Sequence, residues 1–318
     1  KSSRKVIKFV NLKEIHNAYF IGIGGIGMSA LARYFSATAK KVAGYDKLPT
    51  NNTADLEKLG IEIHFNDSLE SIPEIYKNKT TTLVVYTRAI PANHLELNFF
   101  LNQNFQVMKR AEVLGMITKN TFCFAVAGTH GKTTTSAILG HIMQPYNATS
   151  FLGGISENYH SNLILGADKI SVVEADEYDK SFLNLSPNIA CITSMDADHL
   201  DIYGEHAALE ESFQEFANKV SDVLIVAKGS KVSGLSYAIN EDADYKISNI
   251  IVRNGNYIFD VTTPNNHIKE IVFLLPGKHN MMNALAALAM ADCYGIPLKN
   301  IKKSLQTFKG VERRFSYK

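Results

Sequence analysis

Short apolar runs alternate with amphipathic stretches along the first third of the chain. Apolar runs of strand length are followed by stretches with helical spacing, and a few turn-forming residues separate them. We expect strands at 18–23, 41–45, 61–64, 82–86 and 106–108, and helices at 28–35, 54–59 and 111–117. Strands and helices in alternation predict a parallel sheet with helices on both faces.

A second alternating series begins after residues 118–120, where the pattern breaks. We expect strands at 122–127, 170–174, 189–193 and 223–226, and helices at 132–143, 206–219 and 280–291. Between 235 and 275 short alternating strands follow one another, and Asn254-Gly255 is typical of a hairpin turn. The prediction is an α/β protein with a Rossmann-like parallel-sheet domain (1–119) and a P-loop ATPase α/β domain with an added antiparallel patch (120–314).

Composition restricts the class of protein. The chain has 318 residues, of which 46% are hydrophobic and 20% charged, and this suits two globular domains. Its 33 basic and 31 acidic residues give a net charge of +2, so no overall field would attract nucleic acid or a membrane surface. No apolar run is long enough to span a membrane. Cys123, Cys191 and Cys293 each lie in apolar sequence, and we expect buried thiols in a reducing cytoplasm.

The first glycine-rich loop, residues 22–28 (GIGGIGM), satisfies G-x-G-x-x-G between an expected strand and an expected helix. Glycines let backbone N–H groups approach a pyrophosphate, and the start of a helix favours negative charge. Asp46 ends the second expected strand, where an acidic residue accepts hydrogen bonds from a nucleotide. The pattern fits NAD or a sugar nucleotide, and a tight turn without a ligand is the alternative.

The second glycine-rich loop, residues 127–135 (AGTHGKTTT), resembles a P-loop. It departs from the usual spacing, because Val126 stands where the first glycine of that motif is expected. Its glycines can still cradle phosphates, Lys132 can contact β and γ oxygens, and Thr133 can bind Mg²⁺. A dehydrogenase has no use for this loop, so it weakens the NAD interpretation of the first one.

Acidic residues follow two later strands of the second series. Residues 173–179 (VEADEYD) include Glu174 at the end of an apolar run, where a parallel sheet places its ligand. Residues 196–201 (DADHLD) include His199 in the same kind of position. Glu174 and His199 are therefore candidates for holding Mg²⁺, although a solvated acidic turn and a structural histidine are the alternatives.

Two asparagines open the Ala-rich helix near the end of the chain. Asn280 and Asn283 are three residues apart, so they share a helix face and could contact the edge of a base. Without further context, a helix cap and an exposed asparagine explain them equally well.

Six separated motifs in order resemble the Mur ligase family: FIGIGGIGMSALA, AGTHGKTTT, EADEYDKSFL, DADHLDIYG, GKHNMMNA and GVERRF. This resemblance covers nearly the whole chain. It implies a UDP-sugar domain, an ATPase domain and a third domain that carries the amino-acid site. Residues 315–318 would begin the linker to that third domain, and we expect the present chain alone to be inactive.

The resemblance implies a role for each motif. The UDP-sugar would contact Gly22, Gly24, Gly25, Ile26, Gly27, Met28, Asp46, Thr87 and Arg88. ATP would contact Gly128, Thr129, His130, Gly131, Lys132, Thr133, Thr134, Asn280, Asn283 and Arg314. Catalysis would depend on Lys132, Glu174 and His199, and Mg²⁺ on Thr133, Glu174 and His199.

Within this family, the motifs best match the members that attach L-alanine to UDP-N-acetylmuramic acid in peptidoglycan synthesis. ATP would phosphorylate the muramyl carboxylate, and the amine of L-alanine would attack the acyl phosphate. Recycling members that join a tripeptide to the same UDP-sugar are an alternative. A nucleotide-binding fragment without turnover and an NAD-dependent oxidoreductase are two others.

Overall fold

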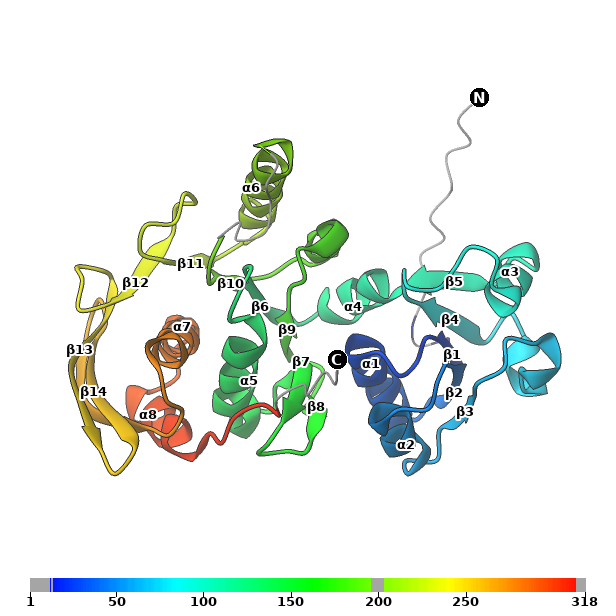
Figure 1. Ribbon diagram of the computed structural model, residues 1–318, viewed down its shortest axis with the longest axis horizontal. Helices are drawn as coiled ribbons and strands as arrows, with labels where there is room; N and C mark the ends of the chain where they lie inside the picture. Colours follow the sequence, from blue (N-terminus) through cyan, green and yellow to red (C-terminus); the bar gives the residue numbers. More distant parts are fainter. Residues whose placement is uncertain (1–11, 13, 196–202, 313–318) are drawn as a thin grey trace. The chain divides into compact units, whose positions relative to one another are not determined.

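The computed structural model describes residues 12, 14–195 and 203–312. The chain divides into two compact units, Lys1–Val113 and Leu114–Lys318, and each has its own β-sheet (Figure 1). The predicted α/β fold is confirmed, and each unit is described separately below.

The first unit is built on a five-stranded parallel sheet in the order β3-β2-β1-β4-β5. Every residue of the central strand β1 is buried. The strand order reverses between β1 and β4, and loops that leave the carboxyl ends of strands at such a point form a ligand site. The strands and helices are β1 (Asn17–Ile21), α1 (Ile26–Ala37), β2 (Lys41–Tyr45), α2 (Asn51–Glu57), β3 (Glu62–His64), β4 (Thr82–Tyr86), α3 (Leu95–Asn102), β5 (Gln106–Lys109) and α4 (Arg110–Thr118), which continues into the second unit.

The second unit is built on a ten-stranded sheet in the order β15-β14-β13-β12-β11-β10-β6-β9-β7-β8. The strands from β13 to β7 in this order run parallel, and β8, β14 and β15 are antiparallel to their neighbours. The strands are β6 (Phe122–Ala127), β7 (Thr149–Ser156), β8 (Ser161–Ile164), β9 (Ile170–Glu174), β10 (Ile189–Ile192), β11 (Val223–Ala227), β12 (Leu235–Ile239), β13 (Tyr245–Arg253), β14 (Asn256–Thr262) and β15 (His267–Phe273).

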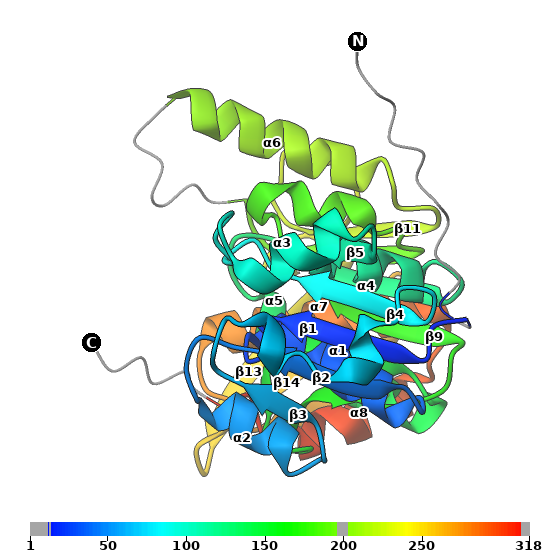
Figure 2. The same ribbon diagram turned by 90° about the vertical axis from the view of Figure 1, so that its right-hand side faces the viewer.

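Helices cover this second sheet on both sides. Helices α5 (Lys132–Met143), α7 (Lys278–Tyr294) and α8 (Leu298–Thr307) pack together on one side (Figure 1). Helix α6 (Tyr203–Ala217) lies on the other side, as Figures 1 and 2 both show. It packs on the short 3-10 helix η4 (Tyr178–Asn184), where the rings of Phe182 and Phe216 stack with centroids 4.9 Å apart.

The antiparallel patch is smaller than the sequence pattern predicts. Strand β12, within the range 235–275, pairs in parallel with both β11 and β13. Because its paired stretches are short, a loop of a few residues is long enough to carry the chain from the end of one strand back to the start of the next parallel strand. Period-two alternation cannot show this, because parallel and antiparallel strands share it. The hairpin at Asn254-Gly255 is confirmed, and both residues have positive φ (51° and 78°).

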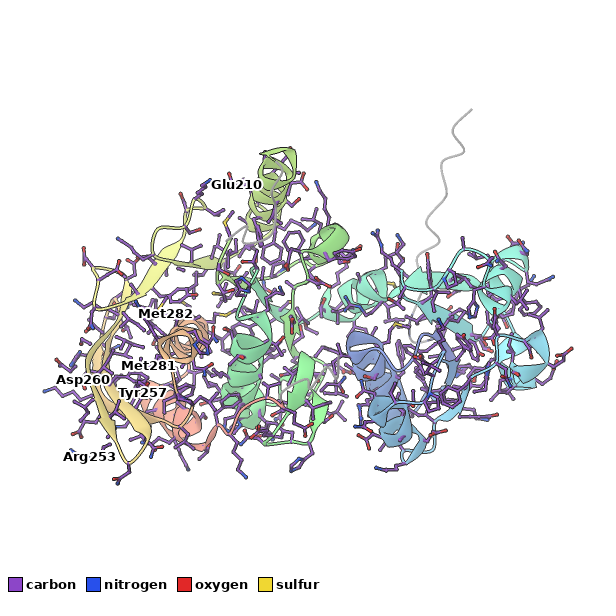
Figure 3. All side chains as sticks on the ribbon, viewed as in Figure 1. Glu210, Arg253, Tyr257, Asp260, Met281 and Met282 are labelled. Carbon is purple, nitrogen blue, oxygen red and sulfur yellow. The ribbon has the colours of Figure 1, made fainter. Side chains whose placement is uncertain are left out.

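Asp260 lies on β14, the middle strand of the antiparallel patch (Figure 3). It contacts one residue at a register shift in each of the two neighbouring strands. Its carboxylate accepts hydrogen bonds from Nδ2 of Asn249 (2.8 Å) and from the backbone N of Glu270 (2.9 Å). These bonds hold the pKa of Asp260 below its usual range. Asn249 and Glu270 both have positive φ, next to the register shifts of their strands. Bulges of this kind bend an edge and disfavour pairing with another chain.

The cysteines are free thiols; Cys123 and Cys191 are buried and Cys293 is partly buried. Burial raises the pKa of Cys123 to about 11 and that of Cys191 to about 12. None of the described helices combines the length and the apolar character that crossing a membrane would need.

Candidate functional site

The first glycine-rich loop connects β1 to α1 at the carboxyl edge of the first sheet. Gly22 has a φ of 88°, and a Cβ there would stand 2.8 Å from Cγ2 of Thr87, which follows β4. The backbone N of Gly24 donates a hydrogen bond to Oδ2 of Asp46 (2.7 Å). The structure therefore brings together Gly22, Gly24, Asp46 and Thr87 from three strand ends. Arg88, the next residue, is exposed.

Arg110 is a neighbour of this loop that the motifs did not indicate. A Cβ on Gly27 would stand 2.9 Å from Nη1 of Arg110, so the guanidinium lies against the first turn of α1. A cation beside a glycine loop adds positive charge where a helix start already favours an anion. The signal in the sequence was weak, because Arg110 belongs to a Lys109-Arg110 pair that matches no motif.

A buried polar cluster lies next to Asp46 in the first unit. The hydroxyl of Tyr19 donates to Oε2 of Glu96 (2.7 Å), and the same hydroxyl is 2.7 Å from Nε2 of His64. The backbone N of Asp46 donates to the carbonyl oxygen of His64 (3.1 Å). Burial raises the pKa of Glu96 to about 7 and lowers that of His64. Sequence reasoning did not find this cluster.

The second glycine-rich loop connects β6 to α5. Gly131 is the N-cap of α5 with a φ of 81°, and a Cβ there would stand 2.5 Å from Oδ1 of Asn283. Gly128 has a φ of 135°, and a Cβ there would stand 2.1 Å from Oγ1 of Thr193. Glycine is therefore required at both positions, because the backbone has a positive φ and because no side chain would fit. Thr193 follows β10, so two strand ends enclose the loop.

Polar contacts hold the middle of this loop in place. The backbone N of Thr129 donates to the carbonyl oxygen of Ser194 (3.0 Å), and the hydroxyls of these two residues are 2.9 Å apart. The backbone N of His130 donates to Oγ of Ser194 (3.0 Å). Thr134 continues the first turn of α5.

Lys132 opens α5 and forms an ion pair with Glu177, which follows β9. Its Nζ donates to the carbonyl oxygen of Gly128 (2.6 Å) and lies 2.8 Å and 3.1 Å from the two carboxylate oxygens of Glu177. The two side chains are 14% and 20% exposed, so water screens the pair less than it screens a surface pair. Glu177 belongs to the predicted acidic run, but its contact with Lys132 was not predicted.

Glu174 ends β9 and faces the same helix start. Oγ1 of Thr133 lies 3.1 Å and 3.0 Å from its two carboxylate oxygens. Burial raises the pKa of Glu174, while the Thr133 hydroxyl and the charge of Lys132 act in the opposite direction. A Cβ on Gly153 would stand 1.9 Å from Oε2 of Glu174, so the carboxylate fits only because β7 has a glycine there.

The other predicted residues divide into three groups. Asn283 is 8% exposed and lies against Gly131, at the phosphate loop. Asn280 instead donates to the carbonyl oxygen of Pro276 (2.7 Å). His199 and Arg314 lie outside the described residues. Within the described ranges, no three His, Cys, Asp or Glu side chains gather closely enough to hold a metal ion by themselves.

Two models of known protein families match most of this chain. A family model described as Mur ligase family, catalytic domain, matches residues 17–121, and one described as Mur ligase middle domain matches residues 126–291. The chain belongs to the Mur ligase family. Each matched region contains one of the two glycine-rich loops.

Relatives and solved structures extend this result. The UDP-N-acetylmuramate–L-alanine ligase of Flavobacterium psychrophilum is 58% identical over 312 residues, which are 97% of this chain and 69% of that protein. The crystal structure of the UDP-N-acetylmuramate-alanine ligase from Thermotoga maritima has a TM-score of 0.83 at 29% identity, covering 94% of this chain and 70% of that chain.

A structure with a different named activity has nearly the same fold. The UDP-N-acetylmuramate:L-alanyl-gamma-D-glutamyl-meso-diaminopimelate ligase from Neisseria meningitides has a TM-score of 0.82 at 23% identity, covering 94% of this chain and 100% of that chain. The fold is therefore common to Mur ligases that add different groups, and it does not select among these groups.

Proposed function

We propose that this protein is an ATP-dependent ligase that attaches L-alanine to the lactyl carboxylate of UDP-N-acetylmuramic acid during peptidoglycan precursor synthesis. The observation that carries the proposal is the arrangement of Lys132, Thr133 and Glu174 around the second glycine-rich loop. High identity to a relative with this named activity supports the choice of substrates.

The second unit suits Mg-ATP. Gly128 and Gly131 leave room for phosphates at the start of α5, where the helix dipole favours negative charge. Lys132 supplies a positive charge beside them. Thr133 and Glu174 offer a hydroxyl and a carboxylate 3.0 Å apart, a pair of oxygen ligands that Mg²⁺ accepts. Bound Mg²⁺ would neutralise charge on the transferring phosphate.

The first unit suits the UDP-sugar. Its glycine-rich loop and Arg110 can together bind a pyrophosphate, and Asp46 lies at the end of the neighbouring strand. This loop alone would accept NAD as well. The second nucleotide loop favours a ligase, because a hydride-transfer enzyme has no use for a phosphoryl-transfer site.

The residues of this chain would act mainly by positioning and charge. Lys132 would stabilise the negative charge that develops on the phosphate, an effect that is large in a preorganised site. Glu174 would fix the hydroxyl of Thr133 in the orientation that its hydrogen bond defines. The muramyl carboxylate would attack the terminal phosphate of ATP, and the amine of L-alanine would then displace phosphate from the acyl phosphate.

The proposal is tested by phosphate release from Mg-ATP in the presence of UDP-N-acetylmuramic acid, with a protein that also carries the expected third domain. We expect release that depends on L-alanine and on Mg²⁺. Release with L-alanyl-γ-D-glutamyl-meso-diaminopimelate instead of L-alanine would favour the recycling ligase. Binding of both nucleotides without turnover would indicate a nucleotide-binding fragment. Binding of NADH, without binding of the UDP-sugar, would refute the proposal.

A further inference from the structure

The ammonium group of Lys132 is shared between its own loop and a carboxylate from another strand end. One of its contacts is the carbonyl oxygen of Gly128 at 2.6 Å, and the other is Glu177 at 2.8 Å and 3.1 Å. Glu177 thus neutralises the charge that a phosphate would need. Glu174 has a different partner, because its two carboxylate oxygens accept from Thr133. Glu177 and Glu174 therefore contact different residues at the start of α5.

The backbone of Glu177 is held in place by the η4 segment that follows it. Its carbonyl oxygen accepts from the backbone N of Lys180 (3.1 Å), and the carbonyl oxygen of Asp176 accepts from the backbone N of Phe182 (2.9 Å). Phe182 is 1% exposed and stacks on Phe216 of α6. A buried aromatic anchor therefore fixes the position from which Glu177 reaches Lys132.

We propose that Glu177 is a positioning residue that keeps Lys132 extended along the loop and exchanges places with an incoming nucleotide phosphate. This inference rests on the proposed nucleotide site in the second unit. The carboxylate and a phosphate oxygen are both anionic acceptors, and they compete for the same ammonium group. Binding of the phosphate has to break or weaken the ion pair, and this lowers the observed affinity.

If the two anions exchange places, removing the charge of Glu177 should strengthen ATP binding. Glu177→Gln keeps the shape of the side chain but removes the charge that competes with the phosphate. We expect the Kd for ATP to fall about fivefold, which corresponds to about 1 kcal/mol, the upper end for an ion pair that is not fully buried. The tightening should occur with Mg²⁺ and also in EDTA, because it depends on the lysine.

The experiment measures ATP binding by competition against a fluorescent ATP analogue. The variants are Glu177→Gln and, as a matched control, Glu215→Gln, which removes one negative charge from α6 at an exposed pair with Lys180 (3.5 Å). Both are also combined with Lys132→Ala. In that background Glu177→Gln should have no effect, since its partner is gone. Glu215→Gln should not change the Kd in either background.

The possible outcomes separate this proposal from others. Tighter binding that needs Lys132 and does not need Mg²⁺ supports the exchange. Weaker binding that is confined to the Mg²⁺ arm would make Glu177 a metal-binding residue and overturn it, as would an unchanged Kd. If the unaltered chain binds no ATP, the nucleotide site itself is refuted, and the ion pair is purely structural.

Discussion

The two glycine-rich loops occupy equivalent positions in their sheets but have different surroundings. Each leaves the carboxyl end of a central parallel strand and opens a helix. Around the first loop, Asp46 accepts from the backbone N of Gly24 and Arg110 lies against Gly27. Around the second, Lys132 and Thr133 extend from the helix itself and meet Glu177 and Glu174. We infer that the first loop holds a ligand and that the second also carries groups that can act on one.

The buried carboxyl groups near the two loops show the same difference. Burial raises the pKa of both Glu96 and Glu174. For Glu174 the charge of the nearby Lys132 opposes that rise. Glu96 instead accepts a hydrogen bond from the neutral hydroxyl of Tyr19, and its other carboxylate oxygen lies 3.4 Å from Nε2 of His64, whose pKa is lowered by burial. We infer that the charge of Lys132 favours the ionised form of Glu174, whereas Glu96 is a structural acid.

The largest effect should come from removing the cation of the second loop. In a protein that also carries the expected third domain, we expect Lys132→Ala to lower phosphoryl transfer on the order of a hundredfold or more, the scale for losing one preorganised charge-stabilising group. Binding of UDP-N-acetylmuramic acid should be unchanged, because that ligand is assigned to the other unit. Phosphate release and UDP-sugar binding measure the two effects.

A lysine on the surface of the same unit provides the matched control. Lys231 pairs with Glu210 and is 69% exposed (Figure 3 labels Glu210). Lys231→Ala should leave phosphoryl transfer unchanged, since exposed ion pairs contribute little. Equal losses in both variants, or full activity of Lys132→Ala, would contradict the role of the second loop.

The next effect tests the first loop by filling it. Gly25 has φ −60° and ψ 144°, which suit a β-branched residue, and a Cβ there would meet no atom closer than 3.6 Å. Gly25→Val should therefore fold normally but block a pyrophosphate. A ligand at a hundred times its Kd stabilises a protein by about 2.7 kcal/mol. We expect this stabilisation by UDP-N-acetylmuramic acid to disappear, measured as the loss of its melting-temperature shift.

Two comparisons make this result specific. The shift caused by Mg-ATP should persist in Gly25→Val, and NAD should shift neither protein. Gly24→Val should also lose the UDP-sugar shift, but a Cβ there stands 2.8 Å from Cγ2 of Thr53, so this variant should be less stable as well. A retained UDP-sugar shift in Gly25→Val would place the ligand elsewhere.

The sequence predicted the loops well because their chemistry is local. A glycine with positive φ, the lysine after it and the acid that ends a strand all lie within short motifs. The strand Ile170–Glu174 and the helix Lys132–Met143 have the predicted bounds for the same reason. Hydrophobic periodicity and helix capping both depend on residues that are close together in the sequence.

Contacts between distant segments could not be predicted in this way. Arg110 reaches Gly27 across 83 positions in the sequence (110 minus 27) only because the sheet brings β5 and β1 into one layer. The pairing of Lys132 with Glu177 depends on the turn into η4. The parallel pairing of β12 depends on its neighbours, since alternation is the same in both orientations.

The smallest effect tests the conclusion that Glu96 is a structural acid. Its pKa is raised to about 7 in the folded protein, so the folded state binds its proton more tightly than the unfolded state does. This contribution to stability is fully present below the ordinary carboxyl pKa and is lost as pH rises through about 7. Glu96→Gln cannot ionise and should therefore not lose it. We expect the stability of Glu96→Gln relative to the unaltered protein to increase by about 2 kcal/mol from about pH 5 to about pH 8.

Urea unfolding followed by circular dichroism at both pH values measures this change. His64 keeps its place in both proteins, so its own lowered pKa, which acts in the opposite direction, cancels to first order in the difference. Glu70→Gln is the matched control, because it makes the same replacement at an exposed glutamate of the same unit. If the relative stability of Glu96→Gln does not change between these pH values, Glu96 is already an anion in the folded protein. The contrast between the two buried carboxyl groups would then be wrong, and the cluster beside Asp46 would have to be considered as part of the ligand site.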